Sequence, residues 1–176
     1  DEIINLMDFD CKQRDGVHFF YTLPYDKNKA LVETTWLSKM KDNSQKDYDF
    51  QIKNYIEKNL NLKDYKITYK EVGVIPLFYP SNSNSLNKIN IGTAGGMTRL
   101  STGYTFLNIQ EHSEHIRKNI ENITTAKPFE ISKKYRFLDK IFLKVLEKNP
   151  EKMPNIFFKM FNTSSNTVIK FLSNKS

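Results

Sequence analysis

A glycine-rich segment at residues 92–96 offers backbone chemistry for binding an anion. It follows a short apolar run at residues 88–91, which predicts a strand, and it precedes a segment that favours a helix. Glycines permit positive φ and close approach of the backbone, and a helix N-terminus offers unpaired N–H groups to an anion such as a pyrophosphate. The same glycines could instead form a tight turn that packs a strand against a helix, so the motif alone leaves both interpretations open.

Glu33 lies inside an otherwise uncharged, largely apolar run at residues 30–36. In a strand, Glu33 shares a face with Leu31 and Thr35, whereas the intervening residues point to the other side. An acid in this position either faces solvent on a half-exposed sheet or lies in a lined pocket. In a pocket the loss of hydration favours the neutral carboxyl, which could then donate a proton. The pattern leaves both alternatives open.

The remaining reactive side chains give weaker signals. His112 and His115 lie three residues apart on the same predicted helix, as two metal ligands could, but no third ligand has a suitable spacing. We therefore expect no metal site, and both histidines on the surface. Cys11 is the single cysteine of the chain, so no internal disulfide can form and a reducing compartment is expected.

The elements that must position these residues begin with strands. Residues 3–12 favour a strand, and two β-branched and aromatic runs at 18–23 and 30–36 predict an antiparallel hairpin. An apolar stripe at 47–60 predicts a helix, and residues 65–78 favour a further strand.

The second part of the chain favours helices. Ser101 or Thr102 could cap a helix over roughly 103–121, and two short apolar helices are expected around 154–161 and 165–172. Between them, residues 135–148 predict a basic amphipathic helix. The apolar stripe of this helix consists of Leu138, Ile141, Phe142 and Val145. Its basic residues are Arg136, Lys140, Lys144 and Lys148.

Composition narrows the possible classes of protein. The 176 residues carry a net charge of +7, are 39% hydrophobic and include only 6 glycines and 6 prolines, which excludes collagen-like and low-complexity chains. Residues 127–176 hold 11 basic and 4 acidic side chains, whereas the charges of residues 1–126 cancel. This basic end either binds an anionic partner or is a solvated lysine-rich helical face.

Six segments, in this order along the chain, resemble the lycopene cyclases, specifically the lycopene β-cyclase group of flavoproteins. They cover roughly residues 5–120, with a looser likeness over the helix at 135–146. The segments are Leu6-Met7-Asp8-Phe9, Phe19-Phe20-Tyr21-Thr22-Leu23-Pro24, Ala30-Leu31-Val32-Glu33-Thr34-Thr35, Glu71-Val72-Gly73-Val74-Ile75-Pro76, Ile91-Gly92-Thr93-Ala94-Gly95-Gly96-Met97-Thr98 and Ser101-Thr102-Gly103-Tyr104-Thr105-Phe106.

This resemblance implies an enzyme that isomerises the ψ-end groups of lycopene to β-ionone rings without net oxidation, in carotenoid biosynthesis. Glu33 matches the acidic strand motif of the family and is expected to be the catalytic acid or a coupled acid–base group. Aromatic faces could stabilise the carbocation by cation–π attraction, with Phe20, Tyr21 and Trp36 as candidates. Reduced FAD is the expected cofactor. The residues expected to approach it are Gly92, Thr93, Ala94, Gly95 and Gly96.

The resemblance also implies a location and an architecture. Because the substrate is an apolar polyene dissolved in a membrane, we expect a cytoplasmic protein bound peripherally to the inner face of the cell membrane, through the basic helix, and no nucleic-acid partner. The fold class expected is α+β. It would combine a partly antiparallel substrate-side sheet in residues 1–87, a strand–glycine turn–helix of a Rossmann-like FAD domain in 88–126, and a basic helical cap in 127–176.

Three departures from the family pattern modify these expectations. The family's N-terminal dinucleotide-binding unit carries the pattern G-x-G-x-x-G, which is absent here, so we expect this chain to be the C-terminal portion of a longer protein and inactive alone. Thr34 stands where the family often has a second acid. Leu100 stands where a proline is common before Ser-Thr-Gly-Tyr.

Two other functions remain open from the sequence. A related FAD-dependent polyprenyl reductase or hydroxylase would share the broad architecture but would change the oxidation state of its substrate. A non-catalytic module could instead use residues 127–176 to bind a membrane or nucleic acid.

Overall fold

The computed structural model describes residues 4–13, 16–39, 44–80, 88–123 and 125–173. Contacts divide the chain into two compact units, each described here by itself. Unit 1 comprises Asp1–Glu71 and Asn149–Phe157, and unit 2 comprises Val72–Lys148 and Phe158–Ser176. The chain is of mixed α and β structure, which confirms the predicted fold class. The division at residues 87 and 126 stays a prediction.

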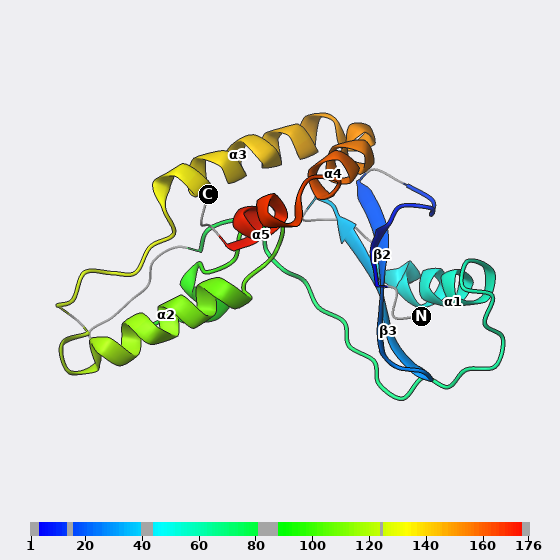
Figure 1. Cartoon of the computed structure of the whole chain (residues 1–176), viewed down its shortest axis with the longest axis horizontal. Helices are drawn as coiled ribbons and strands as arrows, with labels where there is room; N and C mark the ends of the chain where they lie inside the picture. Colours follow the sequence, from blue (N-terminus) through cyan, green and yellow to red (C-terminus); the bar gives the residue numbers. More distant parts are fainter. Residues whose placement is uncertain (1–3, 14–15, 40–43, 81–87, 124, 174–176) are drawn as a thin grey trace. The chain divides into compact units, whose positions relative to one another are not determined.

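Unit 1 is built on a three-stranded antiparallel sheet of order β1-β2-β3 (Figure 1). The strands are β1 (Asn5–Asp8), β2 (Val17–Asp26) and β3 (Lys29–Leu37). The predicted hairpin is confirmed, but its strands are longer than expected because Pro24 and Ala30 still pair, which leaves only residues 27 and 28 to turn. β1 is shorter than the predicted strand at 3–12, of which residue 3 lies outside the described residues.

One face of this sheet is covered by α1 (Tyr48–Lys58), close to the predicted helix. The rings of Phe20 and Tyr55 stack with centroids 4.0 Å apart, and both side chains are buried. On the same face, the buried His18 donates from Nδ1 to the carbonyl oxygen of Lys12 at 3.1 Å and accepts at Nε2 from the Thr34 hydroxyl at 2.7 Å. Its ring also stacks on Trp36, so His18, Phe20 and Trp36 pack together on the face that α1 covers.

The other face is covered at only one end. Phe9 packs edge-on against Phe19, with centroids 5.5 Å apart, and stacks on Phe157 of α4 (Met153–Phe161) at 6.0 Å. Tyr21, next along this face, packs its ring against Phe19. The remainder of the face, farther along the strands, is only half-buried.

The predicted strand at residues 65–78 is wrong. No strand is formed there, and the segment runs extended and largely exposed. A strand needs a hydrogen-bonded neighbour, and in the described part of the chain none lies beside this segment. The large apolar side chains that remain exposed are Tyr65, Ile67, Tyr69, Val72, Val74, Ile75 and Phe78.

Unit 2 is helical. It contains the 3₁₀ turn η2 (Gly92–Gly95), α2 (Phe106–Lys118), α3 (Lys133–Lys148), α5 (Ser165–Ser173) and the last residues of α4 (Figure 1). The last two helices match the prediction. In the described residues no helix is both long and apolar enough to cross a membrane.

Two local predictions in unit 2 are wrong. Residues 88–91 form no strand, and only Lys88 makes an isolated bridge. α2 begins at Phe106 rather than 103, and no side chain caps it. The start is delayed because residues 99–104 form a closed turn, in which Arg99 donates its amide to the carbonyl of Tyr104 and accepts from the amide of Gly103.

Candidate functional site

The glycine segment forms a tight turn whose conformation itself requires glycine. Gly92 and Gly96 have φ of 59° and 76°, in the region that L-residues avoid. A Cβ on Gly95 would lie 2.5 Å from the carbonyl oxygen of Asn90. The amides of Gly95, Gly96 and Met97 donate within the turn, whereas no backbone acceptor among the described residues is bonded to the amides of residues 92–94. Packing therefore accounts for the glycines, and their contact with a cofactor stays a prediction.

A cavity of about 550 Å³ lies beside this turn, wholly within unit 2. Its size falls in the range of small-molecule sites. Ala94, Gly95 and Gly96 form one wall, and residues of α2 and of segment 126–131 form others. Its lining includes the cations Lys88, Lys127 and Arg136 and one acid, Glu130. The cavity thus combines apolar walls with a net positive lining.

His112 is the buried polar side chain of this cavity. Its residue is 8% exposed, and its ring stacks on Phe129 with centroids 5.4 Å apart. Burial, and then the neighbouring His115, lower the pKa of His112, so the ring is neutral with one donor and one acceptor nitrogen. Neither nitrogen is hydrogen-bonded to a described residue. The prediction that His112 lies on the surface is wrong, because α2 turns this position inward.

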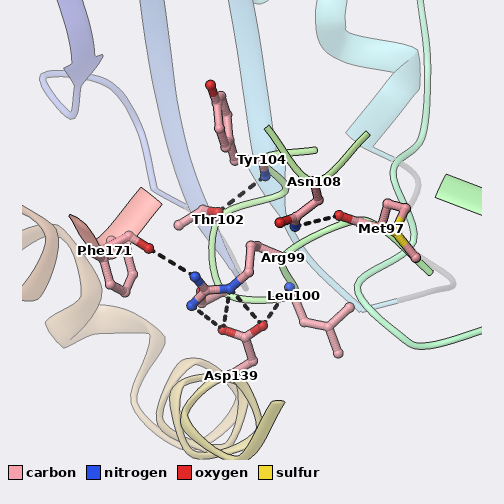
Figure 2. Close-up of polar contacts among 9 residues, drawn as sticks. Met97, Arg99, Leu100, Thr102, Tyr104, Asn108, Asp139 and Phe171 are labelled. Atoms are coloured by element: carbon pink, nitrogen blue, oxygen red, sulfur yellow. Dashed lines mark hydrogen bonds and ion pairs between the residues drawn. The ribbon is translucent and has the colours of Figure 1, made fainter. Parts of the chain in front are cut away.

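Sequence reasoning missed the most buried ionic contact of unit 2, between Arg99 and Asp139 (Figure 2). Arg99 Nη2 donates to Asp139 Oδ1 at 2.8 Å, and Nε lies 3.1 Å from Oδ2. Asp139 Oδ2 also accepts the Leu100 amide, and Arg99 Nη1 donates to the carbonyl oxygen of Phe171. The pair joins the segment after the glycine turn to α3 and α5.

A second contact fixes the same segment. The Asn108 side chain of α2 donates to the carbonyl oxygen of Met97 at 2.7 Å, and both residues are buried (Figure 2). The guanidinium of Arg99 also lies 5.0 Å from the ring centre of Tyr135 and 5.3 Å from that of Phe171. Buried polar contacts therefore hold residues 97–100, immediately after the turn, in one conformation.

In unit 1 Glu33 lies on the partly open face of the sheet. Its side chain is exposed, which is the first of the two alternatives that the sequence left open. Thr35 donates its hydroxyl to Glu33 Oε1 at 2.8 Å, and Tyr21 is the cross-strand partner of Glu33. Burial, and then the charge of Glu33, raise the pKa of Tyr21 to about 12, so the phenol keeps its proton at any physiological pH. Glu33 and the turn at 92–96 belong to different units.

Of the three aromatic candidates, the structure brings only Tyr21 beside Glu33. Phe20 pairs with Thr34 and Trp36 pairs with His18, so both point to the face covered by α1. Phe20 stacks there on Tyr55, and Trp36 stacks on His18. Thr34, which replaces the second acid of the family pattern, uses its hydroxyl to hold His18.

No alternative reactive centre emerges from the described residues. They contain no group of three or more histidine, cysteine, aspartate and glutamate side chains placed to hold a metal ion. Cys11 is half-buried, and burial, followed by the charges of Asp8 and Asp10, raises the pKa of its thiol to about 12. The thiol is therefore protonated and unreactive as a nucleophile.

α3 is amphipathic in a different way from the prediction. Tyr135 and Asp139 form its buried side, whereas Leu138 and Ile141 of the predicted apolar stripe are 44% and 45% exposed, and Phe137 is 63% exposed. Exposed lysines lie among these apolar residues on the outward side: Lys133, Lys134, Lys140, Lys144 and Lys148. The exposed side of α3 therefore mixes apolar and basic side chains.

Comparison with known proteins supplies one match. A sequence model of the family described as "Lycopene cyclase protein" matches residues 2–175. No curated protein and no solved structure matches the chain.

Proposed function

Because the chain belongs to the lycopene cyclase family, whose enzymes act in carotenoid cyclisation, we propose that it supplies the proton donor for closing the ψ-end groups of lycopene to β-ionone rings. The observation that carries the proposal is the position of Glu33. Its carboxyl lies on the partly open face of an antiparallel sheet, beside Tyr21 and hydrogen-bonded to Thr35. An apolar polyene lying on this face would cover the acid and exclude water from it.

The proposed reaction is redox-neutral. The Glu33 carboxyl gives its proton to the terminal double bond, and a new carbon–hydrogen bond and a carbocation form. Electrons of a second double bond of the same molecule then close the ring, and the Glu33 carboxylate accepts a ring proton, which regenerates the acid. The carboxyl must therefore be neutral when the substrate binds, and exclusion of water by the polyene favours that form.

Thr35 and Tyr21, which lie beside Glu33, have different roles in the proposed reaction. The Thr35 hydroxyl donates a hydrogen bond to Oε1 of Glu33, so Oε2 is the oxygen that can carry the reacting proton. The ring of Tyr21 is half-buried beside the acid and offers a π face to the positive charge. Phe20 and Trp36 have no part here, because side chains on opposite faces of a sheet cannot contact one ligand.

Reduced FAD is the cofactor proposed for the intact protein. When bound, its negative charge would stabilise positive charge on the polyene. The cavity beside residues 94–96 supports this assignment, because it is large enough for part of such a group, carries a net positive lining and contains the neutral, buried His112. We propose that a further N-terminal dinucleotide-binding portion completes the cofactor site.

The outward face of α3 is the proposed contact with the inner face of the cell membrane. Phe137, Leu138 and Ile141 could enter the interface while the surrounding lysines reach the anionic headgroups. This contact would bring the enzyme to a substrate that is dissolved in the membrane.

Reversing four charges on α3 is expected to abolish binding to anionic vesicles. Each lysine near an anionic surface contributes roughly 1 kcal/mol, so four reversals should weaken binding more than about 100-fold. Vesicle co-sedimentation at several salt concentrations measures the effect. The test residues, all changed to glutamate, are Lys133, Lys134, Lys140 and Lys144.

The matched control makes the same change of net charge on exposed lysines of unit 1: Lys53, Lys58, Lys63 and Lys66. The control protein should lose much less affinity, because only long-range attraction is reduced. Equal losses in the two variants, or binding by the unchanged protein that ignores lipid charge, would contradict a specific role of α3.

Product mass tests the proposed reaction against the related reductase. Incubation of the intact protein with lycopene should give a product of unchanged mass that contains β-rings. A product heavier by added hydrogen would show that the protein reduces its substrate instead. The assay requires only chromatography and mass spectrometry of the extracted carotenoids.

A further inference from the structure

Three aromatic rings close one end of the sheet face that carries Glu33. Phe9 and Phe157 lie against Phe19 of β2, with ring centroids 5.5 Å and 6.5 Å from it, and they stack on each other at 6.0 Å. Phe19 and Phe157 are each only 3% exposed, so the rings are closely packed. All three residues belong to unit 1, as Glu33 does. Together they form a phenylalanine cluster that fills this end of the face.

The phenylalanine cluster begins one residue pair away from Glu33. Across the two strands, Phe19 pairs with Thr35 and Tyr21 pairs with Glu33. A strand rises about 3.3 Å per residue, so these two pairs lie about 7 Å apart along the sheet. That length suits the branched end of a polyene, whereas a whole carotene molecule is several times longer. Only the end of such a molecule therefore fits between Glu33 and the cluster.

In the opposite direction the same face is apolar and only partly covered. Leu23 and Leu31 pair with each other at the next position toward the hairpin turn, and both are half-buried. Leu6 lies on this face too, because the preceding Asn5 bonds to Tyr55 on the face that α1 covers. Leu6 is 46% exposed. The three leucines therefore continue the apolar surface away from the phenylalanine cluster.

We propose that the phenylalanine cluster is an end stop for the polyene substrate, and that Leu6, Leu23 and Leu31 contact the rest of its chain. This inference rests on the proposed function, because it takes Glu33 as the proton donor. A polyene too long for the cluster side must extend over the leucines, so the face allows one orientation. When the end of the polyene rests against the cluster, its last double bond lies beside Glu33 and the inner double bonds lie beyond it. The cluster thereby determines which double bond receives the proton.

A substrate with one enlarged end tests the end stop in the unchanged intact protein. The probe is a lycopene analogue in which ethyl groups replace the two terminal methyl groups at one end only. The larger end would hold its double bond away from Glu33, so ring formation there is expected to be about tenfold slower or more. The other end of the same molecule should cyclise at the normal rate. Chromatography with tandem mass spectrometry distinguishes the two rings.

Truncating the phenylalanine cluster is expected to restore ring formation at the ethyl end. Phe9→Ala and Phe157→Ala each remove a ring from the stop, so the ratio of ethyl-end to methyl-end rings should rise several-fold. Phe50→Ala, the same change at a 69% exposed position of α1, should leave this ratio unchanged. Because both ends react in one sample, the ratio does not depend on how much of a variant is folded.

Equal rates at the two ends in the unchanged protein would overturn the end stop, and so would a ratio that neither Phe9→Ala nor Phe157→Ala raises. Both results would leave the proton-donor role of Glu33 intact, since Glu33→Gln tests that role separately. An unchanged protein that forms no ring from lycopene itself would contradict the proposed function, and the end stop with it.

Discussion

Replacing Asp139 by alanine is expected to lower the free energy of unfolding by about 3–5 kcal/mol, the usual effect of breaking a buried ion pair. Arg99 is 1% exposed and Asp139 is 0% exposed, so the substitution would leave a guanidinium charge buried without its carboxylate. The Leu100 amide would lose its acceptor at the same time. Urea unfolding of the protein, followed by circular dichroism, measures the change.

Two controls separate burial from charge pairing. The Arg117–Glu114 pair is equally short, at 2.7 Å, but both side chains are largely exposed, so Glu114→Ala should give no measurable change in the urea midpoint. The double variant Arg99→Met with Asp139→Leu replaces both charges by apolar groups of similar size and should be more stable than Asp139→Ala. An Asp139→Ala protein that unfolds at the normal urea midpoint would show that the pair is dispensable.

Changing Glu33 to glutamine in the intact protein is expected to lower the rate of ring formation by about 10²–10⁴-fold, the usual contribution of a positioned acid. Glutamine has nearly the same size and can still accept the hydrogen bond from Thr35, but its amide cannot donate a proton to an alkene. Binding of reduced FAD should be unchanged. Initial rates measured with lycopene in liposomes provide the comparison.

Glu57→Gln is the matched control for this substitution. It removes an acid from α1, where Glu57 makes a long contact of 3.9 Å with Lys53, and should leave the rate unchanged. A Glu33→Gln protein as fast as the Glu57→Gln protein would remove Glu33 from the catalytic role.

The local elements of this fold could be predicted because their signals are local. The β2–β3 hairpin follows from two β-branched and aromatic runs, and α3 follows from an apolar period that suits a helix. The segment at 65–78 has the same strand character, yet it forms no strand because strand formation also requires a neighbour. The sequence of a segment shows its capacity to pair, and the rest of the fold decides whether it does.

The ionic centre of unit 2 could not be predicted in this way. Arg99 and Asp139 are 40 residues apart, and nothing in the intervening sequence brings them together. One signal was available, since Asp139 lies four residues after Tyr135 on the same helical face. An acid on an otherwise apolar face needs a cation, but the sequence does not say which one.

Predictions for the candidate site residues were limited in the same way, because contacts between distant segments decide where these side chains lie. Alternation along one strand correctly placed Glu33 with Thr35, and it also placed Trp36 on the opposite face. Whether Phe20 or Tyr21 joins Glu33 depends on the register between β2 and β3, in which Tyr21 pairs with Glu33. The turn sets this register, and the sequence alone did not give the turn's length. His112 was assigned to the surface because its burial depends on segment 126–131, which lies beyond its own helix.

The most direct test of the proton-donor role is to run the reaction in deuterated water and count deuterium in the product by mass spectrometry. A carboxyl exchanges its proton with solvent, so each β-ring made by the intact protein should carry one deuterium that the starting lycopene lacked, and the Glu33→Gln protein should form almost no labelled rings. Rings without deuterium, or labelled rings formed by Glu33→Gln at the normal rate, would contradict proton donation by Glu33.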